Sequence, residues 1–422
     1  MDGEQWNKAK EIFGKALACD PDRRNDFLQE ACGGDESLRL EVASLLSAYD
    51  SSDGLSIPPW LDVLPPGIPV EGRTIGPYRL VRRLGEGGMG QVWLAEQAVP
   101  VHRQVAIKLL RIGINDPAAL RRFHAERQSL AMMDHPAIAK VFDAGATPDG
   151  QPFLVMEYVP GQPITDYCDQ NKLGLQQRLD LFVAICEGVE HAHQKTVIHR
   201  DLKPANLLVV NVDGKPTPRI IDFGLAKIIA LQADDHRLTG TGSRLGTPGY
   251  MSPEQADPRR YRVDTRTDVY SLGSVLYELM AGVLAFDVES GRPLDQVLRQ
   301  LREQDPPRPS ARIGPACADI AGNRGTDARS LARELRGDLD LIALKALERE
   351  RERRYGSAAE LAEDIRRYRL NLPIMARPAS RRYRLGKFLR RHRPGVAAVA
   401  AALILVTIAG GSFAGCQFTL TP

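Results

Sequence analysis

The feature that most constrains the fold is a change in residue periodicity partway along the chain. From about Pro77 to Leu110 the residues alternate and favour strands, whereas helical patterns dominate from Pro117 to about Leu370. This separation of strands from helices predicts an α+β fold with two lobes. We expect a small β-rich lobe followed by a larger helical lobe.

Two shorter segments precede this region. Residues 1–50 have apolar positions at three- and four-residue steps, and Asp20 and Asp35 are the predicted helix starts. Residues 51–76 begin with "SSDGLSIPPWLDVLPPGIPVEG", which predicts an extended, proline-rich linker. We therefore expect a small helical unit, whose function the sequence does not indicate, joined by a linker to a main domain at residues 77–370.

A basic segment at residues 371–394 precedes an uncharged run at residues 395–415. At about 1.5 Å per residue this run is long enough for a bilayer core of about 30 Å; a buried core helix is the alternative. Basic flanks stay on the cytoplasmic side. We therefore expect one transmembrane helix in the cytoplasmic (inner) membrane, with the main domain in the cytoplasm and residues 416–422 as a short extracytoplasmic tail. A G-x-x-x-G pattern at Gly411 and Gly415 makes a homodimer one candidate assembly.

Composition excludes some classes of function. Lys and Arg total 56 and Asp and Glu total 53, so the formal net charge of +3 predicts no nucleic-acid partner. The six cysteines form no C-x-x-C pair, and we expect them to be reduced core thiols. The N-terminus lacks the apolar run of a secretory signal.

Gly85, Gly87 and Gly90 form a G-x-G-x-x-G pattern in "LGEGGMGQVWLA". Dinucleotide-binding folds use the same letters to open a helix, whereas Val92 and Trp93 continue here as a strand. Glycines at the tip of a hairpin allow backbone N–H groups to approach phosphates without interference from Cβ. The pattern predicts a phosphate-binding hairpin, with a plain glycine hairpin as the alternative.

Lys108 interrupts the apolar strand "VAIKLL", where burial of a lysine is costly without an anionic partner. In the following helix, Glu126 falls on an otherwise apolar face. A pair between Lys108 and Glu126 would account for both charges and would hold the lysine for the phosphates of a nucleotide. A salt bridge with a purely structural role is the alternative.

Five polar residues lie between two apolar runs in "VIHRDLKPANLLV", and Asp222 follows in "IIDFGLA". Phosphoryl transfer requires magnesium, positioned phosphates and a carboxylate that faces the attacking hydroxyl. Asp222 and Asn206 would hold magnesium. Asp201 would accept or orient the hydroxyl proton, and Lys203 would neutralise charge on the transferred group. The alternative is a solvated polar loop.

With these motifs, the region from about Pro77 to Leu370 resembles the eukaryotic-type (Hanks-type) protein kinase family. The matching segments are the glycine loop, Lys108, Glu126, "HRDLKPAN", "DFG" and "GTPGYMSPE". The resemblance implies a bilobal kinase fold, ATP with Mg²⁺ or Mn²⁺, and protein substrates. Lys203 and Thr247 resemble serine/threonine rather than tyrosine kinases, which implies transfer of the γ-phosphate of ATP to serine or threonine hydroxyls.

The resemblance also implies roles for residues that spacing alone does not identify. Met156 would be the gatekeeper and Glu157 to Val159 the hinge that binds adenine. The side chains that would enclose the base are Leu84, Val92, Ala106 and Leu208. Asp268 would brace the catalytic loop, and Arg354 would pair with Glu254. Ser252 stands where the family often has alanine, a departure that affects no catalytic residue.

The N-terminal helices, the "SPEQA" turn and the predicted span resemble bacterial transmembrane serine/threonine kinases, which implies a role in signal transduction. Larger members of that group continue beyond the membrane into a sensor region. We expect autophosphorylation within "HRLTGTGSRLGTPGY" to switch the activity. Phosphate on Thr239 or Thr241 would pair with Arg200, which directly precedes Asp201.

Two other classes of function fit parts of this pattern. A pseudokinase that acts as a nucleotide-gated binding module would be expected to lack Lys108, Asp201, Asn206 or Asp222, and all four are present. A small-molecule phosphotransferase shares a related fold but has no need of a peptide-docking segment such as 222–254. Both classes are therefore less consistent with the sequence than a protein kinase.

Overall fold

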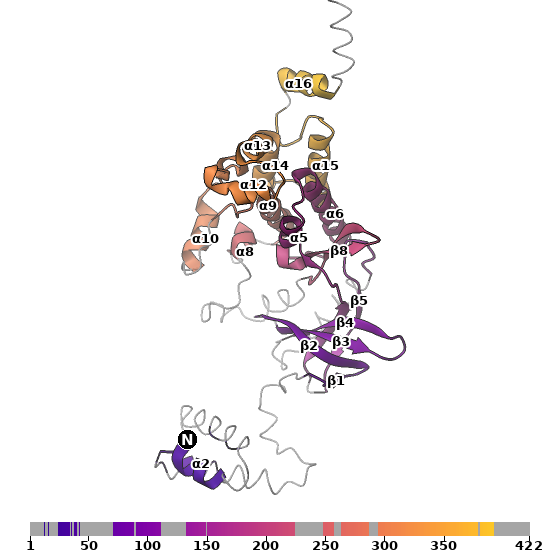
Figure 1. The fold of residues 1–422 in the computed structure, drawn as a ribbon, viewed down its shortest axis with the longest axis vertical. Helices are drawn as coiled ribbons and strands as arrows, with labels where there is room; N and C mark the ends of the chain where they lie inside the picture. Colours follow the sequence, from indigo (N-terminus) through magenta and orange to yellow (C-terminus); the bar gives the residue numbers. More distant parts are fainter. Residues whose placement is uncertain are drawn as a thin grey trace, which may run out of the picture. The chain divides into compact units, whose positions relative to one another are not determined.

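The computed structural model divides into two compact units, Met1–Pro69 and Val70–Pro422, which are described one at a time (Figure 1). In the first unit the described residues are Ile12, Ala16, 24–33, Asp35, Leu38, Arg39 and Val42. In the second they are 71–87, 90–110, 132–148, 150–223, 248–256, 263–286, 294–378 and 380–391. Predictions for residues outside these ranges stay predictions.

The first unit contains helix α2 (Arg24–Ala31) and a small apolar core. The buried residues of this core are Ile12, Ala16, Leu28, Cys32, Leu38 and Val42. The Asp35 carboxylate accepts a hydrogen bond from the Leu38 amide at 3.1 Å, as a residue that caps a helix N-terminus does. This contact agrees with the predicted helix start at Asp35.

The second unit begins with a six-stranded antiparallel sheet, which forms the N-lobe. Its strand order is β1-β2-β3-β4-β6-β5. The strands are β1 (Thr74–Ile75), β2 (Tyr78–Gly87), β3 (Gly90–Gln97), β4 (Arg103–Leu110), β5 (Val141–Ala146) and β6 (Pro152–Glu157). The alternating residues of the first part of the domain therefore form strands, as their periodicity predicts.

The two faces of this sheet contribute to different cores because successive side chains of a strand point to opposite sides. In β4, Val105, Ile107 and Leu109 belong to a core made only of N-lobe residues. Ala106 and Leu110 belong instead to the large core that continues into the helical lobe. Lys108 lies midway between Ala106 and Leu110 along the strand, so the alternation directs it to the same side.

The C-lobe is mainly helical. Its principal helices are α5 (Ile164–Gln170), α6 (Leu175–Gln194), α9 (Thr265–Ala281), α10 (Leu294–Glu303), α13 (Ala328–Leu335), α14 (Asp338–Ala346) and α15 (Ala358–Arg369). Shorter helices are α8 (Pro253–Ala256), α11 (Pro309–Arg312) and α12 (Ala318–Gly322). Helix α9 is buried along most of its length and contacts α6, α14 and α15 (Figure 1).

Two further elements complete the described part of the second unit. A small antiparallel sheet, in the order β7-β8-β9, is formed by β7 (Gln162–Pro163), β8 (Leu207–Val212) and β9 (Lys215–Ile220). Helix α16 (Arg381–Arg391) follows the C-lobe. Because β8 begins directly after Asn206, this sheet positions the polar loop that precedes it.

Several predicted features fall outside the described residues. They are the helix that carries Glu126, the loop that carries Thr239, Thr241 and Thr247, and the uncharged run 395–415. Within the ranges that the structure describes, the helices are too short or too polar to cross a bilayer.

Candidate active site

The loop that contains Asp201 is held by the buried carboxylate of Asp268, at the start of α9. Its two oxygens accept hydrogen bonds from the backbone amides of His199 and Arg200, both at 2.8 Å. His193 of α6 lies 2.8 Å from the same carboxylate. Arg200 has a φ of 63°, a left-handed conformation that L-residues other than glycine adopt at a cost. Asp268 thus accepts hydrogen bonds from two residues of a strained turn, and these contacts agree with the bracing role that the resemblance implies.

Asp268 remains ionised at neutral pH despite its complete burial. Burial by itself raises the pKa of a carboxyl group, but the hydrogen bond with His193 and the nearby histidine and amide donors outweigh it. The pKa of Asp268 therefore lies below its ordinary value. A charged acceptor makes stronger hydrogen bonds to the loop than a neutral one.

Asp201 lies within a group of polar side chains after this turn. The side-chain amide of Asn206 donates to the Asp201 carbonyl oxygen at 2.7 Å and to its carboxylate at 3.2 Å. Lys203 Nζ lies 3.2 Å from the same carboxylate. The structure therefore brings together three of the four residues that the sequence places in phosphoryl transfer. With its amide nitrogen engaged, Asn206 keeps its amide oxygen available as a ligand.

The segment that carries Asp222 is connected to the catalytic loop. The Ile221 amide donates to the Asn206 carbonyl at 2.9 Å. His199 Nε2 lies 3.0 Å from the Ile221 carbonyl, and its ring centroid is 4.6 Å from that of Phe223. Burial lowers the pKa of His199. The neutral ring then donates through Nε2 and accepts from the Asp201 amide through Nδ1, at 3.3 Å.

Lys108 forms an ion pair with Asp222, so the strand lysine of the N-lobe meets the carboxylate that follows β9. Lys108 is buried, whereas the Asp222 side chain is 28% exposed. Asp222 has a φ of 60° and is a second strained residue in the site. The expected partner Glu126 lies outside the described residues, so the pair between Lys108 and Glu126 stays a prediction. The structure shows a different anionic partner for the lysine.

Sheet register groups the expected adenine-contacting residues on one face of the N-lobe. Ala106 of β4 is paired with Met156 of β6, and Lys108 is paired with Val92 of β3. Ala106 and Met156 are buried, and Val92 is partly buried against the same core. Since paired residues of antiparallel strands point to the same side, these four side chains share a surface.

The other expected nucleotide contacts come from three different segments of the chain. Leu84 of β2 is 36% exposed, Val159 is buried after β6, and Leu208 is half-buried in β8. The Glu157 amide donates to the Lys140 carbonyl at 2.8 Å, which ties the expected hinge to the residue that precedes β5.

The three glycines of the loop differ in what surrounds them. A Cβ at Gly90, whose φ is 143°, would lie 1.9 Å from the Leu109 carbonyl oxygen, so the close approach of β3 and β4 requires a glycine there. Among the residues that the structure describes, a Cβ at Gly85 or Gly87 would meet no atom within 4 Å. Packing therefore explains Gly90, whereas no contact with the described residues requires a glycine at the other two positions.

The donor set of the site fits magnesium. Asp222 supplies carboxylate oxygens and Asn206 an amide oxygen, the hard ligands that Mg²⁺ prefers. No group of three or more histidine, cysteine or acidic side chains suited to a metal gathers in the part of the chain that the structure describes. Mg²⁺ commonly uses one or two protein carboxylates and completes its shell with water and substrate phosphates.

The segment that contains α8 is fixed to the rest of the C-lobe by a buried ion pair. Arg354 donates to both oxygens of Glu254, at 2.7 and 2.8 Å, and Thr267 donates to the same carboxylate at 2.8 Å. The pair expected between Arg354 and Glu254 is therefore present. Gln255 donates to the Arg200 carbonyl at 2.7 Å, a contact that sequence reasoning missed. It connects the "SPEQA" turn directly to the catalytic loop.

The family model for the protein kinase domain matches residues 78–359 of this chain. The chain belongs to the protein kinase family. The match covers both lobes and includes every residue of the site described above. The polar loop between two apolar runs lies within the matched region.

Bacterial kinases are among the relatives. The chain is 34% identical over 332 residues to the serine/threonine-protein kinase Pkn1 of Myxococcus xanthus, covering 78% of this chain and 43% of that one. It is 38% identical over 293 residues to the serine/threonine-protein kinase PknB of Mycobacterium tuberculosis, covering 68% and 42%. The chain thus matches less than half the length of these relatives.

A solved kinase structure shows a similar fold. The PknI kinase domain of M. tuberculosis aligns with a TM-score of 0.51 and 26% identity, covering 71% of this chain and 98% of that one. The aligned protein is a kinase domain alone, so the likeness concerns the bilobal domain and not the flanking segments.

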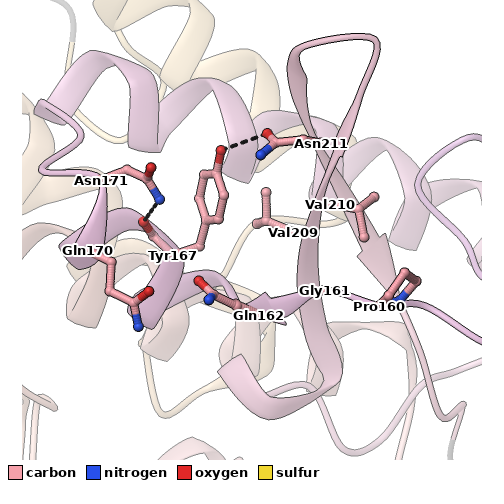
Figure 2. Close-up of a pocket in the computed structure, with 9 residues that line it drawn as sticks. All are labelled: Pro160, Gly161, Gln162, Tyr167, Gln170, Asn171, Val209, Val210 and Asn211. Carbon is pink, nitrogen blue, oxygen red and sulfur yellow. Dashed lines mark hydrogen bonds between the residues drawn. The ribbon is translucent and has the colours of Figure 1, made fainter.

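One pocket is lined by residues other than the predicted site residues, although Pro160 and Val209 of its lining directly follow Val159 and Leu208 in the chain. It has a volume of about 470 Å³ and is bordered by α5, β7 and β8 (Figure 2). Tyr167 donates to the Asn211 side chain across it at 2.9 Å, and Asn171 donates to the Tyr167 carbonyl at 2.8 Å. None of its nine lining residues is among the predicted site residues. We therefore assign this pocket no role in phosphoryl transfer.

Proposed function

We propose that the chain is an ATP- and magnesium-dependent protein serine/threonine kinase that acts in bacterial signal transduction. The observation that carries the proposal is the geometry around Asp201. Its carboxylate lies beside Lys203 and Asn206, on a loop tied by backbone hydrogen bonds to the segment of Asp222. The names of the bacterial relatives support the choice of serine and threonine as acceptors.

Each residue has a role that follows from its chemistry. Asp201 accepts or orients the proton of the attacking hydroxyl, and Lys203 stabilises negative charge on the transferred phosphoryl group. Lys108 holds the phosphates of ATP. Asp222 and Asn206 would hold Mg²⁺, which supplies positive charge to the phosphates when bound. The ion pair of Lys108 with Asp222 must therefore open or rearrange when a nucleotide binds, because both groups then have other partners.

The same arrangement of residues suggests where adenine and the peptide substrate bind. We assign the base to the surface of Val92, Ala106 and Met156, with Leu84, Val159 and Leu208 around it and Glu157 to Val159 as the hinge. The peptide substrate is assigned to the segment that Glu254 and Arg354 hold. Thr247 is the expected contact that favours serine and threonine acceptors.

The test is transfer from labelled ATP. The purified chain with Mg²⁺, γ-labelled ATP and a generic protein substrate should produce phosphoserine and phosphothreonine on acid hydrolysis. Binding of ATP without transfer would favour the nucleotide-gated binding module. Label found only on small molecules would favour the small-molecule phosphotransferase.

We also propose that residues 395–415 anchor the kinase in the cytoplasmic membrane, with the kinase domain in the cytoplasm. The uncharged length and the basic flank support this topology. A charge at the centre of a spanning helix costs about 2.5 to 3.5 kcal/mol. Leu405→Arg should therefore shift the full chain from the membrane fraction toward the soluble fraction after lysis. Wild-type chain found mainly in the soluble fraction would contradict the span.

A further inference from the structure

Helix α16 contacts the C-lobe through two side chains. Figure 1 shows it at one end of the described part of the kinase region. Tyr383 and Lys387, one helical turn apart, both contact the carboxylate of Asp338 at the start of α14. The Lys387 ammonium lies 2.7 Å from it, and the Tyr383 hydroxyl donates to it at 3.0 Å. The side chains of Lys387 and Asp338 are only 8% and 10% exposed, so this contact is nearly closed to solvent.

The opposite face of α16 is apolar and exposed. At about 100° per residue, Leu385 and Leu389 lie on the far side of the helix from Tyr383 and Lys387. Their exposed fractions are 58% and 40%, and Phe388 beside them is 50% exposed. Exposed apolar side chains that gather into a patch point to an interaction or membrane site, whereas scattered ones do not.

Arginines flank this apolar face. Arg382 and Arg384 are exposed on its two sides, whereas Arg381 is exposed on the same side as Leu385 at the start of the helix. Residues 371–394 contain no acidic residue. A helix with an apolar strip and a basic border is typical of helices that lie in the interface of an anionic bilayer. The apolar strip enters the acyl-chain boundary, and the guanidinium groups pair with lipid phosphates.

The proposed span sets an upper limit on the distance from α16 to the bilayer. The helix ends at Arg391 and the span begins at residue 395. At about 3.3 to 3.6 Å per residue, four steps of fully extended chain reach no more than about 14 Å. The end of α16 is therefore confined to the neighbourhood of the lipid headgroups.

We propose that α16 is an interfacial helix that binds anionic phospholipids and fixes the kinase domain at the membrane surface. The apolar face of Leu385, Phe388 and Leu389 contacts the bilayer while the face of Tyr383 and Lys387 holds Asp338 of the C-lobe. The lipid contact is thereby connected to the start of α14 in the C-lobe. This inference rests on the proposed span, because only a membrane anchor keeps α16 close to lipid at all times.

The experiment places a fluorescent reporter on α16 of the full chain in lipid nanodiscs. The emission that Leu389→Trp adds to the wild-type chain is measured with lipids brominated in the acyl chain near the headgroup. The matched control is Val212→Trp, which replaces a residue that is 42% exposed at the end of β8. In discs rich in phosphatidylglycerol, bromolipid should quench the added emission of Leu389→Trp at least about two-fold more than that of Val212→Trp.

A charge variant tests the lipid class. An Arg near an anionic surface contributes about a five-fold change in binding, so Arg382→Gln with Arg384→Gln should sharply reduce the quenching. The same change at Arg299 and Arg302, which are exposed on α10, should leave it unchanged. Replacement of phosphatidylglycerol by phosphatidylcholine should also reduce it.

The possible results distinguish a failure of the α16 proposal from a failure of the proposed membrane span. Chain that is soluble after lysis would contradict the span itself. Chain that is inserted, but in which bromolipid quenches Leu389→Trp no more than Val212→Trp, would overturn the role of α16 alone. A third outcome is that the Trp of Leu389→Trp is shielded from solvent to a degree that depends on protein concentration and not on lipid charge. This would identify a second copy of the chain as the partner of the apolar face and would also overturn the proposal.

Discussion

At the scale of single residues, the two buried carboxylates Glu254 and Asp268 have different partners that compensate for their burial. Glu254 is 2% exposed and depends on a bidentate guanidinium, whereas Asp268 is buried among amides and histidines. Burial alone would raise the pKa of Glu254, but the Arg354 guanidinium opposes this and holds the pKa below its ordinary value. Loss of either partner leaves a charge in the core.

Glu254→Gln should therefore lower the free energy of unfolding by about 3 to 5 kcal/mol at pH 7. A carboxyl group with a lowered folded-state pKa contributes stability above its unfolded pKa and loses that contribution as the pH falls through the folded pKa. The difference between variant and wild type should accordingly shrink below about pH 4.5, the ordinary value for this group. Urea denaturation at a series of pH values measures it.

Glu303→Gln is the control, since Glu303 pairs with Arg299 at 2.9 Å on the exposed side of α10. Surface pairs contribute little, so this variant should unfold almost as the wild type does. Equal effects of the two variants at pH 7 would show that the buried pair is not a structural requirement.

At the scale of elements, the alternating pattern of the strands predicted both where the strands lie and which side their residues face. Alternation in 77–110 predicted the strands, and it also directs Lys108 to the same side as Ala106. The contact of Lys108 with Asp222 could not be predicted in this way, because it joins residues 114 positions apart. The Gln255 contact with the Arg200 carbonyl was not predicted for a related reason. A side chain that binds a distant backbone atom produces no recognisable pattern in the sequence.

The motifs, by contrast, could be placed from the sequence because each is a short segment with a fixed local order. The loop from His199 to Asn206 and the segment at Asp222 are brought together as expected. Bracing by Asp268 and pairing of Glu254 with Arg354 came only from the family resemblance. Neither follows from composition or from spacing.

The loop between Asp222 and Glu254 carries the predicted switch. Phosphate adds about −1.5 to −2 charges and three acceptor oxygens, which an arginine can bind in a bidentate way. Mass spectrometry after incubation with ATP and Mg²⁺ should find phosphate on Thr239, Thr241 or both. The double variant Thr239→Ala with Thr241→Ala should then have lower activity. An unchanged rate would remove the switch and leave the catalytic assignment intact.

At the scale of the whole molecule, catalysis and anchoring should be separable. The matched kinase region ends at residue 359, and the proposed span begins at residue 395. Removal of everything after Pro394 should therefore give a soluble chain with its ATP-dependent transfer to a soluble substrate retained. Fractionation and a transfer assay check this together. Loss of folding or activity on truncation would mean that the last segment takes part in the kinase domain itself.

The most direct test of the central claim is to compare nucleotide binding and phosphoryl transfer in Asp201→Asn. In the proposed mechanism Asp201 addresses the hydroxyl of the acceptor and not the nucleotide, so the affinity for ATP with Mg²⁺ should stay close to that of the wild type. The transfer rate should fall by about 10²- to 10⁴-fold, the usual contribution of a positioned general base. Transfer by the purified variant at a rate near that of the wild type would contradict the assignment of Asp201 as the catalytic carboxylate.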